Sequence, residues 1–396
     1  MNLILTVPAN VDFSEIVKEQ VVSGVRLNTT YTGNDSLTIE NILQSMRQKT
    51  SGKDVWIDLK GRQPRIESYA VDILRDREVH KITLTHPFKL DTPAEVLLDG
   101  GYMRGIVEEV DGRTLIIPSD IKRKEGLFFP QQGQIGIRPG TSLNILHPSF
   151  EIEGFFTKND LAYLEAAQKA GMHKYMLSYV ERIQDVLELF KIDPQAEAVL
   201  KIETPKGIDF VVNEYARLKK SFGRQLNLMT ARGDLYLEIN MPDQIIDASK
   251  LILQADPNAI VASRLMASLK YFPEKSIECN DVTDLYFNMM LGYKQFMVGD
   301  ELTTSETRLM EATALFGALA QKYEKSYPQR TVQPSPRPSS LGGYLRKKFW
   351  GGDGNLPDTL PNPKYHPKSN QLIDAYTEKT PRIDDPHRNG NSEGGS

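Results

Sequence analysis

Hydrophobic positions along the chain form short runs that alternate with longer stripes of helical spacing. In the N-terminal part, apolar residues recur at helical spacing over 12–22, where Gly24 would end the helix, and again over 36–49. Runs rich in β-branched residues and leucine predict strands over 3–7, 25–28 and 54–59. Strands that alternate with helices at this pitch are typical of parallel βαβ units.

The alternation breaks between about residue 67 and residue 138, where no long helical stripe is found. Short alternating runs are separated there by the turn sequences Asp99-Gly100-Gly101, Asp111-Gly112 and Glu125-Gly126. This pattern predicts a small all-β module.

After Leu146 the first rhythm resumes. Helices are predicted over 158–170, 182–190, 207–222, 242–254, 278–290 and 305–323. Strands are predicted over 174–180, 198–202, 226–231, 259–263 and 295–298. Three strands before the β-rich stretch and five after it make eight, the number that closes a parallel barrel. We therefore predict an α/β fold: a (β/α)8 TIM barrel over 1–66 and 140–325, with an all-β domain over 67–139 inserted after strand 3.

The segment 326–396 is rich in proline, glycine, serine and asparagine and has no apolar periodicity, which predicts a mostly disordered tail. A basic and aromatic island, Tyr344 to Trp350, lies within it. Such an island either touches the barrel surface or serves as a docking peptide or membrane-surface contact. The first interpretation is favoured, because one short island is weak evidence for docking.

Composition narrows the class of protein. Hydrophobic residues make up 40% of the chain and charged residues 25%, which is enough for a sizeable core. The net charge of -4 argues against a dedicated nucleic-acid binder. A single cysteine, Cys279, excludes an internal disulfide framework and fits a cytoplasmic location. There is no apolar run long enough to span a membrane and no signal-peptide pattern.

Charged residues recur where the predicted barrel strands end. In a parallel barrel, functional groups collect at the carboxyl ends of the strands, and residues two apart share a face. The strand ends carry Arg26 and Asn28, Asp58 and Lys60, Lys201 and Glu203, Arg232 and Asp234, and Arg264. One such pair could be a surface salt bridge. Five of eight strands are harder to explain in that way, since converging charges are costly to desolvate.

These residue types suit phosphoryl transfer. Glu203 and Asp234 offer the hard oxygen ligands that Mg²⁺ prefers. Arg26 and Lys201 are cations for a phosphoryl group, and Gly233 leaves room for close substrate approach. Oxygens for a monovalent cation come from Asn28, Thr30 and Asp58. A metal, cationic clamps and positioned oxygens are the requirements of that reaction.

The chain resembles the pyruvate kinase family over about residues 1–325. The resemblance rests on the segments 25–30, 57–65, 200–203 and 230–235, which occur in the family's order. Lys-Ile-Glu at 201–203 and Ala-Arg-Gly-Asp-Leu at 231–235 are the more specific of these motifs. The predicted β module also falls where the family has its lid domain.

The resemblance implies a role for each matched residue. Glu203 and Asp234 would bind Mg²⁺ or Mn²⁺ that bridges phosphoenolpyruvate. Lys201 would stabilise the transferring phosphoryl group, and Arg26 would clamp the phosphate. The backbone amides of Gly233 and Asp234 would hold the substrate carboxylate.

Three further roles follow from the same resemblance. A K⁺ site would be formed by Asn28, Thr30, Asp58 and the Leu59 carbonyl. Arg65, with Asn28, would meet the nucleotide. Ser263 stands where the family has a threonine that helps to deliver a proton to the enolate.

The sequence also departs from the family pattern. Gln63 replaces the glutamate associated with K⁺ dependence, Tyr236 replaces a glycine, and Tyr31 replaces a histidine. The last strand is followed by Val298-Gly299-Asp300-Glu301, and the proline-rich tail stands in place of the regulatory domain. The metal and phosphoryl groups are thus kept, while the nucleotide side is altered.

Three functions are compatible with these residues. The first is a pyruvate-kinase-like phosphotransferase that acts on phosphoenolpyruvate and ADP or another acceptor. The second is a Mg²⁺-dependent lyase or aldolase, because Glu203-Thr204-Pro205 is also similar to a segment of citrate-lyase-type aldolases. The third is a non-catalytic phosphoenolpyruvate-binding protein. The sequence leaves open whether the chain forms a homo-oligomer.

Overall fold

The fold is taken from a computed structural model, which describes residues 1–30, 37–101, 103–118, 122–123, 137–271, 277–302 and 306–327. The predicted tail disorder and the island at 344–350 lie outside the described residues, as does Tyr31.

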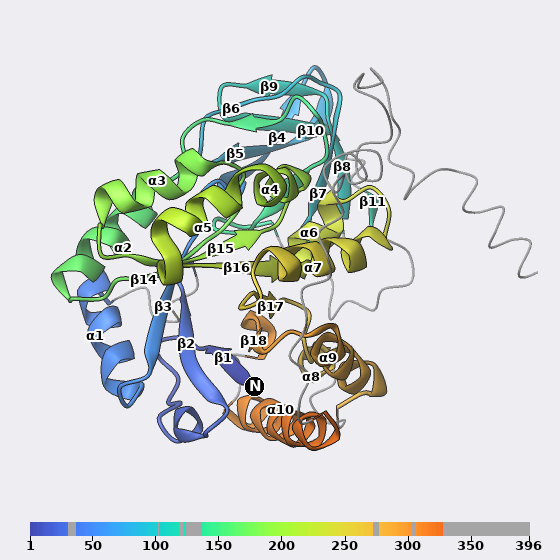
Figure 1. Cartoon of the computed structure of the whole chain (residues 1–396). Coiled ribbons are helices and arrows are strands. Elements are labelled where there is room, and N and C mark those ends of the chain that lie inside the picture. Colours follow the sequence, from blue (N-terminus) through green and yellow to red (C-terminus); the bar gives the residue numbers. More distant parts are fainter. Residues whose placement is uncertain are drawn as a thin grey trace, which may run out of the picture.

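Eight parallel strands close a barrel, as predicted, in the order β1-β18-β17-β16-β15-β14-β3-β2 (Figure 1). Their bounds are β1 Asn2–Thr6, β2 Val22–Asn28, β3 Asp54–Leu59, β14 Lys174–Leu177, β15 Glu197–Ile202, β16 Leu226–Ala231, β17 Ile260–Ala262 and β18 Gln295–Met297. Helices surround this barrel, the arrangement of a TIM barrel.

The helices are α1 Ile39–Lys49, α2 Lys158–Lys169, α3 Ile183–Ile192, α4 Pro205–Phe210, α5 Ala216–Phe222, α6 Arg232–Glu238, α7 Gln244–Ala255, α8 Ser268–Tyr271, α9 Cys279–Leu291 and α10 Glu306–Ser326. A π-helical turn, Val211–Tyr215, joins α4 to α5, so the helix predicted over 207–222 is one continuous element of three parts. Thr204 caps its start through the Gly207 amide, and Pro205 takes the first helical position, where no N–H is needed.

The helix predicted over 12–22 was wrong. The structure has only a 3-10 turn, Ile16–Lys18, and β2 already begins at Val22. Phe13, Ile16 and Val17 are buried as the apolar pattern indicated, but they pack from an irregular connection. Gly24 does not end a helix; it lies inside β2, where an added Cβ would come within 2.8 Å of the Asp54 carbonyl oxygen on β3. The glycine is therefore explained by close approach of two strands.

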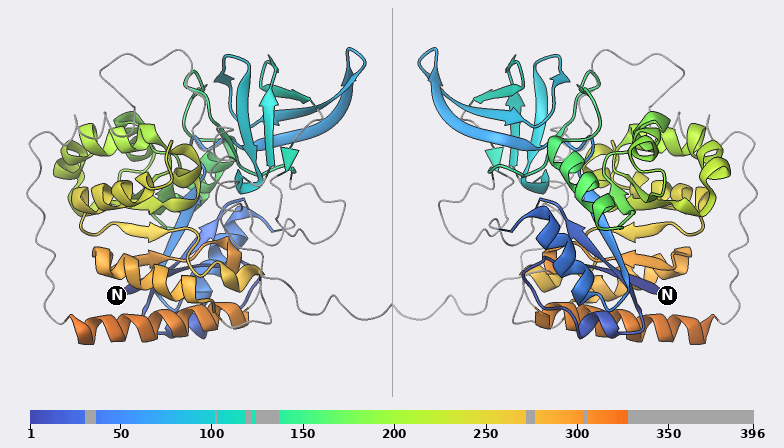
Figure 2. Two further views of the ribbon diagram at one scale, coloured as in Figure 1. Left: turned by 90° about the vertical axis from the view of Figure 1, so that its right-hand side faces the viewer. Right: turned by 90° about the vertical axis from the view of Figure 1, so that its left-hand side faces the viewer.

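Antiparallel strands follow β3 and build a separate β domain with its own core. They are β4 Ile66–Leu74, β5 Arg77–Leu84, β6 Phe88–Lys89, β7 Ala94–Leu98, β8 Met103–Val107, β9 Glu109–Asp111, β10 Thr114–Pro118, β11 Lys122–Arg123, β12 Leu143–Ile145 and β13 Glu151–Ile152. β12 pairs with β7 and β13 pairs with β6, so the sheets extend as far as Ile152. Figure 2 shows this domain projecting from one end of the barrel.

The barrel core has two layers. One lies between the strands and the surrounding helices, and the other fills the barrel interior. The interior layer consists of Ile4, Trp56, Met176, Val199, Met229, Ala231, Ile260, Ala262 and Met297. No helix in the described part of the chain has the length and apolar character needed to cross a membrane.

Candidate functional site

The site is the polar continuation of the barrel interior. Because strand side chains alternate, the residue two positions after each interior residue also faces inward. Trp56 is followed on this face by Asp58, Met176 by Ser178 and Val199 by Lys201. The next residues in these rows are Lys60 and Glu203. The alternation of β15 and its neighbours thus brings polar groups together at the carboxyl end of the barrel.

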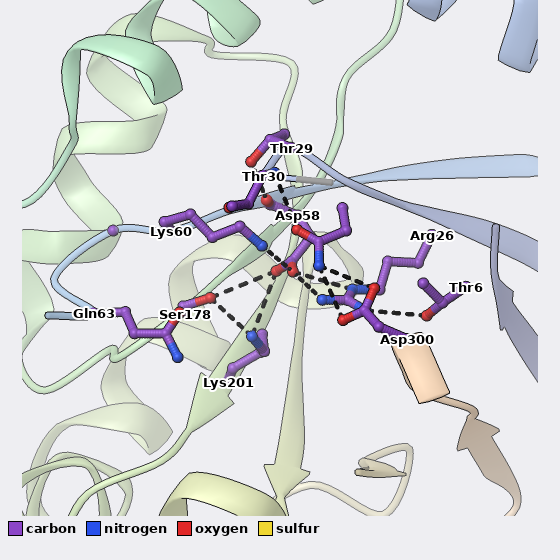
Figure 3. Close-up of polar contacts among 12 residues, drawn as sticks. Thr6, Arg26, Thr29, Thr30, Asp58, Lys60, Gln63, Ser178, Lys201 and Asp300 are labelled. Carbon is purple, nitrogen blue, oxygen red and sulfur yellow. Dashed lines mark hydrogen bonds and ion pairs between the residues drawn. The ribbon is translucent and has the colours of Figure 1, made fainter. Parts of the chain in front are cut away.

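Asp58 lies at the centre of these groups (Figure 3). Its Oδ2 accepts from Arg26 Nη2 at 2.5 Å, Arg26 Nε at 3.0 Å and Lys60 Nζ at 2.8 Å. Its Oδ1 lies 3.5 Å from both Lys201 Nζ and Ser178 Oγ. Burial opposes the charged form, but the cations Arg26, Lys201 and Lys60 outweigh it and hold the pKa of Asp58 well below its usual range.

Lys201 joins this centre to the acidic side of the site. Its Nζ lies 3.2 Å from Glu203 Oε1 and donates to Ser178 Oγ at 2.8 Å. Burial lowers the pKa of Lys201, but the charges of Asp58 and Glu203 more than compensate, so that its pKa is raised overall. Lys60 differs: burial dominates over Asp58 and lowers the pKa of Lys60 to about 7.

Glu203 is buried and Asp234 is partly buried, yet each carboxylate has few hydrogen-bond or ion-pair partners. Glu203 is 2% exposed, and besides Lys201 it accepts from the Tyr179 amide at 2.8 Å. Burial raises the pKa of Glu203 to about 7, and the negative charge of Asp234 adds to this rise. From the described residues, Asp234 accepts amide side-chain hydrogens of Gln63 at 3.2 Å and Asn144 at 3.4 Å. No described lysine or arginine forms an ion pair with it.

The donor set on this side fits a divalent metal ion. The negative charge of Asp234 acts on Glu203, so the two carboxylates lie close enough to repel each other. Mg²⁺ in proteins usually binds one or two carboxylates, and water and substrate oxygens complete its coordination shell. Three or more histidine, cysteine or acidic residues do not cluster with metal-ligand geometry anywhere in the described ranges. Among the described residues, Glu203 and Asp234 are therefore the candidate ligands that the protein would supply.

Arg26 is held from three sides. Besides Asp58, its Nη1 donates to Thr6 Oγ1 at 3.0 Å and to Asp300 Oδ2 at 3.2 Å. Asp300 also accepts from Asn28 Nδ2 at 2.9 Å. Burial works against the charged guanidinium, but Asp300 and Asp58 raise the pKa of Arg26 above its ordinary value. Sequence reasoning did not assign Asp300 a role; its position directly after the last barrel strand was the available signal.

Gly233 and Ser263 lie against each other. Gly233 is in the first turn of α6, a helix that the sequence analysis missed, and an added Cβ there would meet Ser263 Oγ at 2.4 Å. Ser263 adopts a left-handed backbone conformation with φ 71°. Arg232 Nη2 donates to the Ser263 carbonyl at 3.2 Å and pairs with Asp284 at 2.7 Å through Nη1. The Ser263 hydroxyl is thereby held over the Gly233 backbone.

Arg65 reaches the acidic side through Gln63. Arg65 Nη2 donates to Gln63 Oε1 at 2.5 Å, and Nη1 donates to the Gly140 carbonyl. Gln63 then donates from its amide nitrogen to Asp234. The structure thus links Arg65 to Asp234 through one neutral side chain. Tyr236 lies away from this link, with its ring 5.4 Å from the Arg264 guanidinium carbon.

The β domain contributes directly to the site through Asn144 on β12. Its amide nitrogen lies 2.9 Å from both Tyr179 Oη and Glu238 Oε1, in addition to the longer contact with Asp234. Burial raises the pKa of Glu238 to about 8 despite the hydrogen bond from Asn144. Asn144, Tyr179 and Glu238 were missed from the sequence because they meet only when the two domains pack together.

The residues predicted to bind K⁺ lie together but already have protein partners. Asn28 Oδ1 accepts from the Thr30 amide at 3.1 Å. The Leu59 carbonyl accepts from the Ser178 amide at 3.1 Å. Asp58 accepts hydrogen bonds from Arg26 and Lys60 and forms an ion pair with Lys201. Each of these oxygens therefore already has at least one protein partner.

The chain is similar to pyruvate kinases in sequence. It is 27% identical to the pyruvate kinase of Naumovozyma castellii over 251 residues, which is 60% of this chain and 46% of that protein. It is 23% identical to the pyruvate kinase of Methylorubrum extorquens over 342 residues, 79% of this chain and 66% of that protein. The pyruvate kinase of Lachancea kluyveri is 26% identical over 251 residues.

The chain thus spans between about half and two thirds of the length of these relatives. No family profile matches it.

Proposed function

We propose that this chain, a distant homologue of pyruvate kinases over most of its length, transfers the phosphoryl group of phosphoenolpyruvate to ADP or another acceptor. The observation that carries the proposal is Lys201, a buried cation between Asp58 and Glu203 at the carboxyl end of the barrel. Next to it lie Arg26 on one side and the paired acids Glu203 and Asp234 on the other. Phosphoryl transfer requires cationic side chains that bind the phosphoryl group and, close to them, carboxylates that bind the metal ion.

Glu203 and Asp234 would hold Mg²⁺ or Mn²⁺. A divalent ion supplies neutralisation of the phosphate charge in this reaction. The two acids support this assignment, because a cation would relieve the cost that burial imposes on Glu203, whose pKa is raised to about 7.

Arg26 and Lys201 would bind and orient the phosphoryl group. Both side chains are fixed by Asp58, so they enter the reaction already positioned and need little reorganisation. The buried setting strengthens their interaction with a transferring anion, because little water screens it. Ser263, whose hydroxyl is held over Gly233, would take part in proton delivery to the enolate.

Arg65 is the residue proposed to meet the acceptor phosphates, with Asn28 beside the phosphoryl clamp. Both side chains are engaged by the protein, Arg65 by Gln63 and Gly140, and Asn28 by Asp300. The acceptor would have to displace or share these contacts, so a panel of acceptors is the first experiment.

The experiment incubates the protein with phosphoenolpyruvate, Mg²⁺ and a series of nucleoside diphosphates, and measures pyruvate and the nucleoside triphosphate. Lys201→Met is expected to lower turnover by about 10³-fold or more, since it removes a preorganised charge from the transferring group. Circular dichroism and the thermal midpoint report whether the variant remains folded. Lys169→Met, on the exposed face of α2, is the matched control and should be fully active.

Other outcomes would assign the site differently. Normal turnover by Lys201→Met would contradict the proposal. Decarboxylation of oxaloacetate without a nucleotide would favour the lyase function. Mg²⁺-dependent binding of phosphoenolpyruvate in calorimetry, with no turnover against any diphosphate, would favour a binding protein.

A further inference from the structure

The geometry points to a site that needs no monovalent metal cation, because the ammonium group of Lys60 occupies the cation position beside Asp58. The inference deepens the proposed function, since it concerns the same site. It is carried by contacts of the chain's own residues and predicts a response to K⁺ that can be measured without substrate.

The side chain of Lys60 lies beside Asp58. Lys60 follows Asp58 on the same inward-facing row, and its side chain folds back so that Nζ lies 2.8 Å from Asp58 Oδ2. The lysine is 3% exposed. It therefore forms a buried ion pair with the carboxylate that a monovalent cation would need most.

The other oxygens of the predicted K⁺ site already accept hydrogen bonds or face cations. Asp58 Oδ2 also accepts from Arg26, and Oδ1 faces Lys201 and Ser178. The side-chain Oδ1 of Asn28 accepts from the Thr30 amide, and the backbone carbonyl of Leu59 accepts from the Ser178 amide. A cation entering here would have to share or replace these donors.

The positive and negative side chains around Asp58 are equal in number. Three cations, Arg26, Lys60 and Lys201, face three acids, Asp58, Asp300 and Glu203. Five of these six side chains are less than a tenth exposed, and Asp300 is the exception. A further cation beside Asp58 would meet a carboxylate that already has three cations around it, so the cost of desolvating that ion would not be offset. Loss of Lys60 would reverse this and leave an acid in excess.

The backbone around Lys60 shows how the ammonium is kept in place. The amides of Lys60 and Gly61 donate to the two oxygens of the buried Asp160 carboxylate, at 2.8 Å and 3.1 Å. Gly61 has φ 49°, and an added Cβ would meet the Ser178 carbonyl oxygen at 2.6 Å. The turn that carries Lys60 is thus fixed from outside the site.

The test measures the thermal midpoint of the full chain at pH 6, in KCl and in tetramethylammonium chloride of equal concentration. The wild-type protein should unfold at the same temperature in both salts. Lys60→Met should gain about 3 °C or more in KCl over tetramethylammonium chloride, because an ion that binds only the folded state raises its midpoint. Lys60→Arg, like the wild-type protein, should unfold at the same temperature in both salts. Lys169→Met is the surface control.

A higher midpoint of the wild-type protein in KCl would overturn the inference, as would a Lys60→Met variant that does not respond to K⁺. If Lys60→Met fails to fold, the wild-type and Lys60→Arg comparisons still decide, because a K⁺ response in either contradicts it. No substrate is present in these measurements. A failed phosphoryl-transfer assay therefore leaves this inference standing, and the reverse is also true.

Discussion

Glu238 illustrates how the burial of an acid affects stability. Burial raises the pKa of Glu238 from 4.5 to about 8, so the folded protein holds its proton more tightly than the unfolded chain. The free energy of unfolding therefore has its full value below pH 4.5 and falls as the pH rises toward 8. The pKa of Glu203 is raised to about 7, so in the metal-free protein this residue also lowers the free energy of unfolding as the pH rises.

Glu238→Gln should flatten this dependence. We expect the gain in stability of the metal-free variant to be about 1 kcal/mol or more larger at pH 8 than at pH 4, because the amide cannot ionise. Urea denaturation at the two pH values measures the difference. Glu165→Gln, at an exposed position on α2, should leave the slope unchanged. An equal gain at both pH values would show that the effect is not ionisation.

Gly233 and Ser263 should be coupled. In the wild-type background, Gly233→Ala must push the Ser263 hydroxyl aside, because the new Cβ would come within 2.4 Å of it. In a Ser263→Ala background that obstacle is gone, and alanine should stabilise the first turn of α6 by about 0.5 kcal/mol. Denaturation of the four proteins measures the coupling, and the same effect of Gly233→Ala in both backgrounds would exclude it.

Strand periodicity explains which site residues the sequence could predict. Arg26, Asn28, Asp58, Lys201 and Glu203 follow buried strands at even spacing, so their common face could be predicted. The partners from other elements carry no such signal. Asp300 reaches the site from a 3-10 turn and Asn144 from the β domain. The contacts of Asp300 with Asn28, and of Asn144 with Asp234 and Glu238, span more than 80 residues of sequence.

At the scale of elements, α2 supports the site from outside. Thr157 and Asp160 form a capping box at its start, in which each side chain accepts from the other's backbone amide. The same Asp160 carboxylate accepts from the amides of Lys60 and Gly61 after β3. One side chain therefore begins a helix and shapes the turn that follows a neighbouring strand.

Asp160→Ala should cost much more stability than Thr157→Ala. Removing the hydroxyl of Thr157 breaks one cap and should cost about 1 kcal/mol. Removing the buried carboxylate leaves the Lys60, Gly61 and Thr157 amides without acceptors, and should cost about 3 kcal/mol. Urea denaturation distinguishes these values. Similar costs for the two variants would mean that Asp160 acts only as a cap.

The element boundaries were predictable where pattern and hydrogen bonding agree. The strand predicted over 226–231 coincides with β16. The helix predicted over 12–22 failed because the same apolar spacing can pack from an irregular connection, and only Ile16–Lys18 forms a helical turn. α6 was missed because it has only seven residues and begins directly at the end of β16, with polar residues in its first turn.

At the scale of the whole molecule, the barrel and the β domain are joined at the site. Asn144 is the β-domain side chain that contacts Tyr179, Asp234 and Glu238 of the barrel. The division into a barrel and an inserted β module could be predicted from the change in periodicity. Their packing could not, since polar contacts between domains leave no periodic trace in the sequence.

Asn144→Ala should loosen this junction without unfolding either domain. We expect hydrogen exchange to become about tenfold faster or more at the amides of α6 and β12, because a bridge worth about 1.4 kcal/mol would be lost. Thr114→Ala on β10, a change within the β domain, is the control. Faster exchange throughout both domains would instead indicate a general loss of stability.

The closure of the barrel has a consequence for synthesis on the ribosome. β1 pairs with both β2 and β18, and the amino group of Met1 lies 3.0 Å from Glu324 on α10. The first strand therefore waits for its second partner until nearly all of the barrel has been translated. The β domain is complete at Ile152 and has its own core, so it can fold while five strands of the barrel are still unmade. The nascent chain would thus carry a folded β domain before the barrel residues that this domain contacts have come together.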